Sequence, residues 1–173
     1  RNNSFNWTII IADDGSTDGT IEKLVDYKIP NANFVLLQNN GSGIATQTNS
    51  IFNYVLQMET LPDLIFSSDD DIFFKKRGWD SAYFEAAKES GYHHLVHFNP
   101  DWKKPEHVKE ISVNSTTLSS MTNGVSCMGC FYTVTPKLLE EVGGFDQQAF
   151  PIRGHSHIDF TMRACRKGFN DQE

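Results

Sequence analysis

The sequence predicts an α/β fold in a single domain, built on a mostly parallel sheet. Four or five strand-like segments alternate with segments whose apolar residues recur at helical spacing, which is typical of parallel sheets. Carboxylates follow two of the strands, at Asp13-Asp14 and at Asp69-Asp70-Asp71. In open α/β sheets such positions face the crevice where ligands bind. The 173 residues, 39% of them hydrophobic, suffice for one core of this kind.

The first part of the chain predicts two strands and two helices. In order they are a strand at 7–12, a helix after Asp18, a strand at 33–38 and a helix from Ile44. We expect Ser16, Thr17 or Asp18 to cap the first helix and Ser42 to cap the second. The glycine-rich loop before Ile44 could cradle a phosphate, although it lacks the Gly-Lys-Ser/Thr of a P-loop.

The segment 64–74 is an apolar run interrupted by three consecutive carboxylates. Adjacent like charges repel one another, so the triplet implies a cation. Side chains alternate along a strand, which places Asp69 and Asp71 on one side of the chain and Asp70 on the other. Two hard oxygen ligands at this spacing suit Mg²⁺ or Mn²⁺, with positions left for phosphate oxygens. The alternative is a solvated acidic turn.

The second part of the chain predicts three strands and three helices. In order they are a strand at 63–68, a helix at 79–90, strands at 93–98 and 130–135, and helices at 137–142 and 157–167. Residues 119–130 have the composition of a polar loop, and residues 145–154 that of a loop able to cover an active site. Asp159 and Arg163 lie four residues apart on the last helix and can pair. Trp102 could serve packing or sugar stacking.

The charge balance excludes some partners. With 22 acidic and 15 basic residues the net charge is −7, so binding to nucleic acid is not expected. The sequence contains no run of about 18 apolar residues, so it predicts no transmembrane helix. The polar start of the chain does not have the pattern of a signal peptide. Three cysteines in a domain of this size favour a reducing compartment. We therefore expect a cytoplasmic protein, with any membrane association coming from regions outside this chain.

Five segments together resemble the family 2 inverting glycosyltransferases. They are Ile11–Thr20, the loop and helix Gly43–Asn49, Ile65–Asp71, Gly143–Asp146, and His157-Ile158-Asp159 with Arg163. Their order and spacing agree with the family along nearly the whole chain. The resemblance implies a GT-A fold, a Rossmann-like α/β/α sandwich, in one domain over residues 1–173. The nucleotide sugar would bind to about residues 1–75 and the acceptor to about residues 76–173.

The resemblance also implies roles for individual residues. The donor would carry UDP, GDP or dTDP, and the acceptor would be a glycan or another hydroxyl compound. Nucleotide-sugar contacts would come from residues that follow the first strands, namely Asp13, Asp14, Gly43, Asn49, Asp69 and Asp70. Asp69 and Asp71 would form the Asp-x-Asp motif that binds Mn²⁺ or Mg²⁺. His157 or Asp159 would be the catalytic base.

The chain departs from the family pattern at three places. The family begins with one more strand and helix, whereas this sequence starts at a segment that resembles the family's second strand. Thr48 stands where the family often has a basic residue before Asn49, which weakens a diphosphate contact there. Ser156-His157 replaces the family's Glu-Asp pair, so the identity of the base stays open between His157, whose type titrates near neutrality, and Asp159.

Two other functions are compatible with parts of the pattern. A sugar-1-phosphate nucleotidyltransferase also joins a nucleotide, a metal and a sugar, but its glycine-rich, basic first loop is not found in this sequence. A catalytically inactive carbohydrate-binding domain is the other alternative. The Asp69-x-Asp71 pair favours an enzyme over that alternative.

Overall fold

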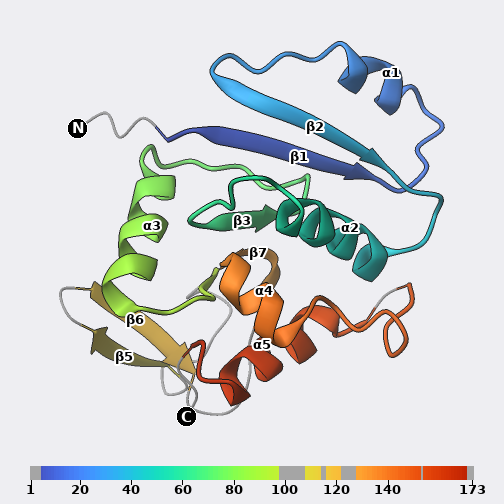
Figure 1. Ribbon diagram of the computed structural model, residues 1–173. Coiled ribbons are helices and arrows are strands. Elements are labelled where there is room, and N and C mark those ends of the chain that lie inside the picture. The colour runs from blue at the N-terminus through green and yellow to red at the C-terminus, as the bar shows by residue number, and fades with distance from the viewer. Residues whose placement is uncertain (1–4, 98–107, 114–115, 122–127, 153, 171–173) are drawn as a thin grey trace. The chain divides into compact units, whose positions relative to one another are not determined.

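The computed structural model describes residues 5–97, 108–113, 116–121, 128–152 and 154–170 (Figure 1). The chain divides into two compact units. The first consists of Arg1–Glu59 with Gly144–Ser156, and the second of Thr60–Gly143 with His157–Glu173. The expectation of one domain with a boundary near residue 75 stays a prediction.

The first unit contains the predicted parallel strand pair. Its elements are β1 (Trp7–Asp13), α1 (Thr20–Val25), β2 (Ala32–Gln38) and α2 (Ile44–Leu56). β1 and β2 are parallel and in register from Trp7 opposite Ala32 to Asp13 opposite Gln38 (Figure 1). The β-branched run of β1 favours this extended pairing, and α2 lies against β1. All four elements were expected from the sequence.

The N-cap positions are Gly19 in α1 and Gly43 in α2, and not the residues expected from the sequence. Asp18, one of the expected caps, still binds the start of α1: its Oδ1 accepts hydrogen bonds from the Thr20 N–H at 3.1 Å and from the Thr20 hydroxyl at 2.6 Å. Both glycines have positive φ, which residues with a side chain adopt at a cost, so the chain enters each helix through a left-handed residue. Val25 of α1 is 66% and Ile44 of α2 56% exposed, whereas Phe52 of α2 is buried.

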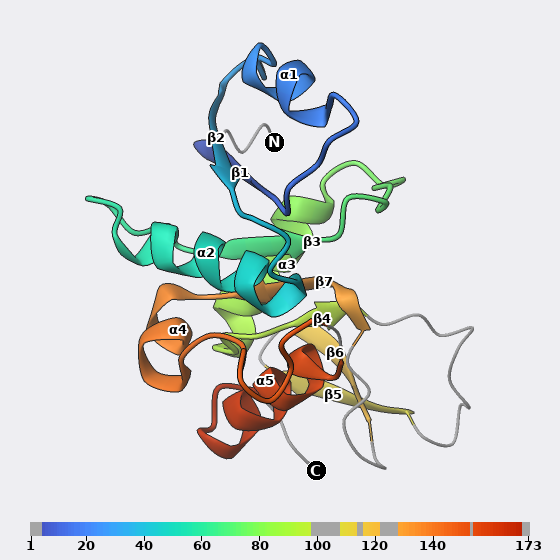
Figure 2. The same ribbon diagram turned by 90° about the vertical axis from the view of Figure 1, so that its right-hand side faces the viewer.

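The second unit combines a mixed set of strands with three helices. Its elements are β3 (Ile65–Ser68), α3 (Trp79–Ser90), β4 (Val96–His97), β5 (Val108–Val113), β6 (Thr116–Met121), β7 (Met128–Val134), α4 (Pro136–Val142) and α5 (Ser156–Arg166). β7 lies between β3 and β4 and is antiparallel to both, and β5 pairs with β6 as an antiparallel hairpin. In Figure 2, β7 runs between α4 and α5 on one side and β3 on the other.

The α/β class is confirmed, but among the described strands only β1 and β2 are parallel. Parallel neighbours need a crossover of a dozen or more residues, usually a helix. Between β4 and β7 the chain instead forms the β5–β6 hairpin, which the sequence analysis missed. Residues 119–130 were expected to be a loop, whereas β6 extends to Met121 and β7 begins at Met128. The Ser/Thr-rich sequence of β6 hides its strand character.

The core of the second unit is formed where β7, α4 and α5 meet. Its buried members are Phe131, Tyr132, Val134, Leu138, Leu139, Phe160 and Ala164. Thr135 caps α4 by accepting a hydrogen bond from the Leu138 N–H, with Pro136 as the first helical residue. This start suits proline, which lacks an N–H to donate. α4 and α5 are thus held against the central strand.

His94 joins β7 to α5 inside this core. Only 3% of its surface is exposed. Nδ1 lies 2.8 Å from the Thr133 carbonyl oxygen and Nε2 lies 2.8 Å from Thr161 Oγ1. A carbonyl can only accept, so Nδ1 carries the proton and Nε2 accepts from the Thr161 hydroxyl. Burial lowers the pKa of His94 to about 4, and the ring therefore stays neutral at pH 7.

We expect His94 to make the fold acid-sensitive. The unfolded chain binds a proton at His94 below its ordinary pKa of 6.5, whereas the folded chain does so only near 4. Stability should therefore fall by about 1.4 kcal/mol per pH unit between pH 6.5 and 4. Denaturant melts across this range measure the slope. A His94→Gln protein cannot titrate there and should show a shallower slope; equal slopes would remove His94 as the cause.

Candidate functional site

The three carboxylates Asp69, Asp70 and Asp71 lie directly after β3, in the second unit. The Asp69 N–H donates to the carbonyl oxygen of Cys130 on β7, at 2.9 Å. Partial burial raises the pKa of Asp69, and the charges of Asp71 and Asp70 raise it further, while His157 opposes this rise. The triplet therefore carries a concentration of negative charge that β7 holds in place and that a cation would compensate.

His157 lies near this triplet because of a glycine on β7. A Cβ atom built on Gly129 would come within 2.8 Å of His157 Cγ, so the imidazole packs where a side chain would otherwise stand. The next residue, Cys130, binds the Asp69 backbone. β7 thus brings the first turn of α5 and the end of β3 to adjacent positions. The contact of Gly129 with His157 was not predicted from the sequence, although a glycine inside a strand often marks such a close approach.

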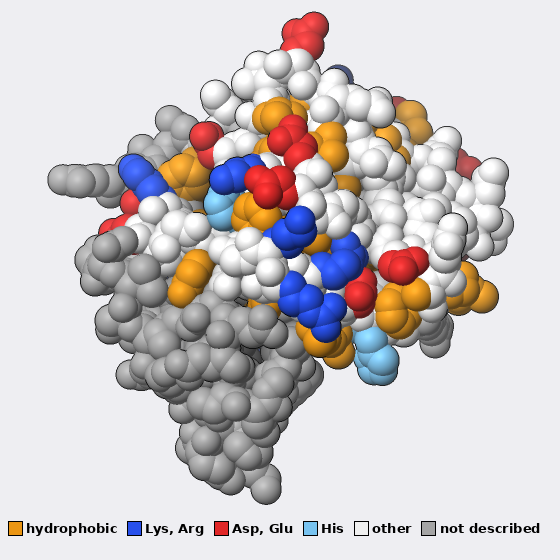
Figure 3. Space-filling view, turned by 60° about the horizontal axis from the view of Figure 1, so that its bottom comes forward, with side chains coloured by type: hydrophobic (Ala, Val, Ile, Leu, Met, Phe, Trp, Pro, Cys, Tyr) orange, Lys and Arg blue, Asp and Glu red, His pale blue; other side chains and the backbone are white. Residues whose placement is uncertain are grey.

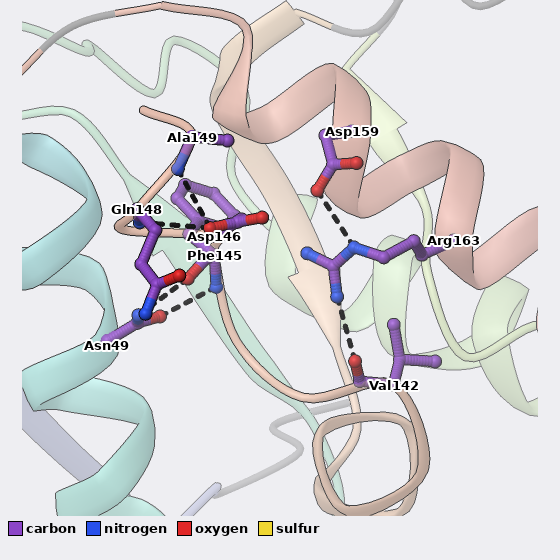
Figure 4. Close-up of polar contacts among 8 residues, drawn as sticks. All are labelled: Asn49, Val142, Phe145, Asp146, Gln148, Ala149, Asp159 and Arg163. Carbon is purple, nitrogen blue, oxygen red and sulfur yellow. Dashed lines mark hydrogen bonds and ion pairs between the residues drawn. The ribbon is translucent and has the colours of Figure 1, made fainter. Parts of the chain in front are cut away.

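Asp159 is engaged elsewhere. Its Oδ2 accepts a hydrogen bond from Arg163 Nε at 2.8 Å (Figure 4), which confirms the expected pair. Arg163 Nη1 also donates to the carbonyl oxygen of Val142, the last residue of α4, at 2.8 Å. A cation that binds a carbonyl at a helix C-terminus is doubly favourable. Asp159 therefore helps to orient an arginine that connects α5 to α4.

The side chains of this triplet fit a hard divalent cation. Carboxylate oxygens are the ligands that Mg²⁺ and Mn²⁺ prefer. Burial raises the pKa of Asp69 most, and the charges of Asp71 and Asp70 raise it further; a cation would offset that charge repulsion. Within the described ranges, no group of three or more His, Cys, Asp or Glu side chains is arranged to hold a metal ion. That Asp69 and Asp71 bind a metal ion stays a prediction.

The first unit presents a different arrangement around Asp13. This carboxylate is buried, and its Oδ2 accepts hydrogen bonds from the Gly15 and Ser16 N–H groups, both at 2.9 Å. Hydrogen bonds from the Ser16 side chain and backbone lower the pKa of Asp13. Asp13 therefore stabilises the turn after β1, and its contact with a nucleotide stays a prediction.

Asp14 binds the N-terminus of α2. Its two oxygens accept hydrogen bonds from the Ser42 N–H at 2.8 Å and the Gly43 N–H at 3.0 Å, and the Gln47 side chain also donates to it. Desolvation would raise the pKa of Asp14, but these hydrogen bonds lower it. A carboxylate thus already occupies the position where the glycine-rich loop was expected to cradle a phosphate. The structure gives no support to a phosphate there.

Asn49 has a structural role in the same unit. Its Nδ2 donates to the Phe145 carbonyl oxygen at 2.8 Å, and its Oδ1 accepts from the Phe145 N–H at 2.7 Å (Figure 4). A Cβ on Gly144 would come within 2.9 Å of Asn49 Cγ. The amide therefore pairs with the backbone of the segment 144–152 as a neighbouring strand would. Its contact with a donor stays a prediction.

The same segment returns to the start of α2. The Ile44 N–H donates to the Ile152 carbonyl oxygen at 3.4 Å. A Cβ on Gly43 would lie 2.6 Å from the carbonyl oxygen of Pro151, so only glycine fits. The loop expected to cover an active site is therefore fixed to α2 at both ends, at Phe145 and at Ile152. Gly43 serves this packing in addition to binding Asp14.

A double-mutant cycle tests this close packing. Gly144→Ala should destabilise the fold by about 1–3 kcal/mol, because the new methyl group displaces the Asn49 amide. Asn49→Ala should cost a similar amount through two lost hydrogen bonds. In the Asn49→Ala background, Gly144→Ala should cost almost nothing, since the clashing amide is gone. Additive costs in chemical denaturation would contradict this packing.

Some of the expected site residues therefore lie together, and others make structural hydrogen bonds within their own unit. Asp69, Asp70, Asp71 and His157 gather around β7 in the second unit, where Asp159 is paired with Arg163. Asp13, Asp14, Gly43 and Asn49 all belong to the first unit and hold its loops. Trp102 lies outside the described residues.

Comparisons with known proteins show which family the chain resembles. The family described as glycosyl transferase family 2 matches residues 1–169. The chain is 27% identical, over 162 residues, to a protein of Acanthamoeba polyphaga mimivirus named "Uncharacterized glycosyltransferase R363". That alignment covers 93% of this chain, which spans 60% of the length of the viral protein.

This chain belongs to glycosyl transferase family 2, because the family matches almost its whole length. The resemblance seen in the sequence is thereby confirmed. In the part of the chain that the structure describes, no helix is long and apolar enough to cross a membrane.

Proposed function

We propose that this chain transfers a sugar from a nucleoside-diphosphate donor to an acceptor hydroxyl, with inversion at the anomeric carbon. The observation that carries the proposal is the gathering of Asp69, Asp71 and His157 around Gly129 and Cys130 of β7. Membership of a glycosyltransferase family supports sugar transfer over nucleotidyl transfer. The donor nucleotide, UDP, GDP or dTDP, and the sugar are left to experiment.

In this proposal Asp69 and Asp71 hold Mn²⁺ or Mg²⁺. The bound ion supplies Lewis-acid neutralisation of the negative charge on the leaving diphosphate. Asp69 is held for this role by its backbone hydrogen bond to β7. Burial and the charges of Asp71 and Asp70 raise the pKa of Asp69, and a bound cation would favour the ionised carboxylate.

His157 is the proposed general base. The acceptor oxygen attacks the anomeric carbon while the bond from that carbon to the diphosphate oxygen breaks, and the acceptor proton passes to the imidazole. Asp159 is disfavoured, because its carboxylate is bound to Arg163 and residues two apart on a helix point about 200° from one another. Asp159 instead positions Arg163, which connects α5 to α4.

Thermal melting with a panel of nucleotides tests donor binding. UDP, GDP and dTDP are added in turn, each with Mn²⁺ and with EDTA. A nucleotide at a hundred times its dissociation constant should raise the melting temperature by several degrees, and only with Mn²⁺. No shift with any nucleotide would contradict the proposal.

A further inference from the structure

The loop between β3 and α3 exposes an unusual amount of aromatic surface. Phe73 is 88% exposed, the largest value among the described large hydrophobic residues, and its neighbour Phe74 is 44% exposed. Removing apolar surface from water is favourable in rough proportion to its area, and a phenylalanine side chain has a large apolar area. A phenylalanine kept in water at the tip of a loop therefore represents free energy that a partner can use.

Phe74, next to Phe73, is held by aromatic neighbours. The Phe74 ring stacks on the Trp79 indole with 3.9 Å between ring centroids and 12° between planes, and it meets the Phe131 ring edge to face at 5.2 Å. Phe74 thereby anchors the loop to α3 and β7. Phe74 is thus held by its ring contacts, whereas Phe73 beside it remains exposed.

Three cations follow the two aromatic residues. Lys75, Lys76 and Arg77 are all exposed, and no salt bridge joins them to a carboxylate within the described residues. By contrast, the face viewed from the α5 side shows Lys and Arg side chains next to Asp and Glu side chains (Figure 3). Asp69, Asp70 and Asp71 precede Phe73, so the charges are separated on the two sides of the tip.

The shape of the loop decides between classes of anionic partner. Figure 2 shows the loop between β3 and α3 extending outward beyond the elements it connects. Binding sites for small molecules and sugar chains are concave. A protruding tip with an apolar end and a cationic stem suits a flat lipid surface, where the apolar residue enters the boundary with the acyl chains and the cations meet the headgroups.

We propose that residues 72–77 dock this protein onto an anionic lipid surface. Phe73 inserts below the headgroups, and Lys75, Lys76 and Arg77 bind their phosphate and carboxylate groups. The overall charge of −7 repels an anionic membrane, so the interaction is local and orients the protein. This docking surface is independent of sugar transfer, and it would place the acidic triplet beside the membrane.

Vesicle sedimentation tests the proposal. The purified protein is mixed with vesicles of phosphatidylcholine, with or without 30% phosphatidylserine, at about 0.1 M salt. We expect binding only to the vesicles with phosphatidylserine. Lys75→Gln with Lys76→Gln should weaken it by on the order of tenfold or more, at roughly fivefold per cation. Phe73→Ser should weaken it about tenfold, and all these variants should melt as the wild type does.

Two control variants test whether the position of the charges and of the aromatic residue matters. Lys23→Gln with Lys28→Gln removes the same charge from exposed positions, and Tyr27→Ser removes an aromatic residue that is 58% exposed. Both should bind as the wild type does. An equal loss in these controls, or no preference for phosphatidylserine, would overturn the proposal. So would equally tight binding to soluble dextran sulfate with the same dependence on Phe73, which would assign the loop to anionic glycans.

Discussion

A protein carrying Asp69→Ala and Asp71→Ala is expected to lose manganese-dependent binding of a nucleoside diphosphate. Two phosphate groups and two carboxylates repel one another strongly unless a divalent cation lies between them. Removing both carboxylates removes the cation and with it the attraction for the diphosphate. We expect the affinity for the nucleotide selected by thermal melting to fall by at least about a hundredfold, a change that calorimetry measures directly.

The stability of this variant separates loss of a site from loss of the fold. Burial and the neighbouring carboxylates raise the pKa of Asp69, so the folded protein disfavours its charge. Removal of the charge should leave the metal-free melting temperature unchanged or higher. Asp63→Ala, a change at an exposed carboxylate before β3, is the matched control and should bind as the wild type does. Wild-type affinity in the double variant would exclude the metal site.

The second large effect is expected at His157. His157→Ala should lower turnover by roughly 10²–10⁴-fold, because the acceptor hydroxyl then loses the group that takes its proton. Nucleotide binding should be nearly intact, since the base acts on the acceptor. Initial rates and calorimetry on the same preparation separate the two quantities.

Two neighbouring variants sharpen this test. His155→Ala changes an exposed histidine two residues away and should retain full turnover. Asp159→Asn keeps a hydrogen-bond acceptor for Arg163 and should lower turnover far less than His157→Ala does. If His157→Ala keeps full turnover while Asp159→Asn loses it, the base is Asp159 and the assignment here is wrong.

Elements that depend on neighbouring residues were predicted correctly. One example is the strand β3 (Ile65–Ser68), which the carboxylate of Asp69 follows directly. The start of α4 at Thr135 and Pro136 is equally local. The pairing of Asp159 with Arg163 follows from helical spacing alone.

Features that depend on distant segments were missed. The antiparallel pairing of β7 with β3 and β4, and the β5–β6 hairpin that precedes β7 in the chain, were not predicted. The role of Gly129 depends on its contact with His157, which lies in a distant part of the sequence. The hydrogen bonds that Asp14 accepts from the Ser42 and Gly43 N–H groups were also not predicted, and its contact with a nucleotide stays a prediction. A glycine inside a strand can mark a close approach, but it does not identify the distant residue that makes the contact.

The most direct test of sugar transfer is the release of nucleoside diphosphate from nucleotide sugars. Wild type, Asp69→Ala with Asp71→Ala, His157→Ala and His155→Ala are assayed side by side with Mn²⁺ and with EDTA. We predict manganese-dependent release by the wild type and by His155→Ala, and release at least about a hundredfold slower by the other two proteins. No release by the wild type from any donor, or equal release by all four proteins, would contradict the proposed function.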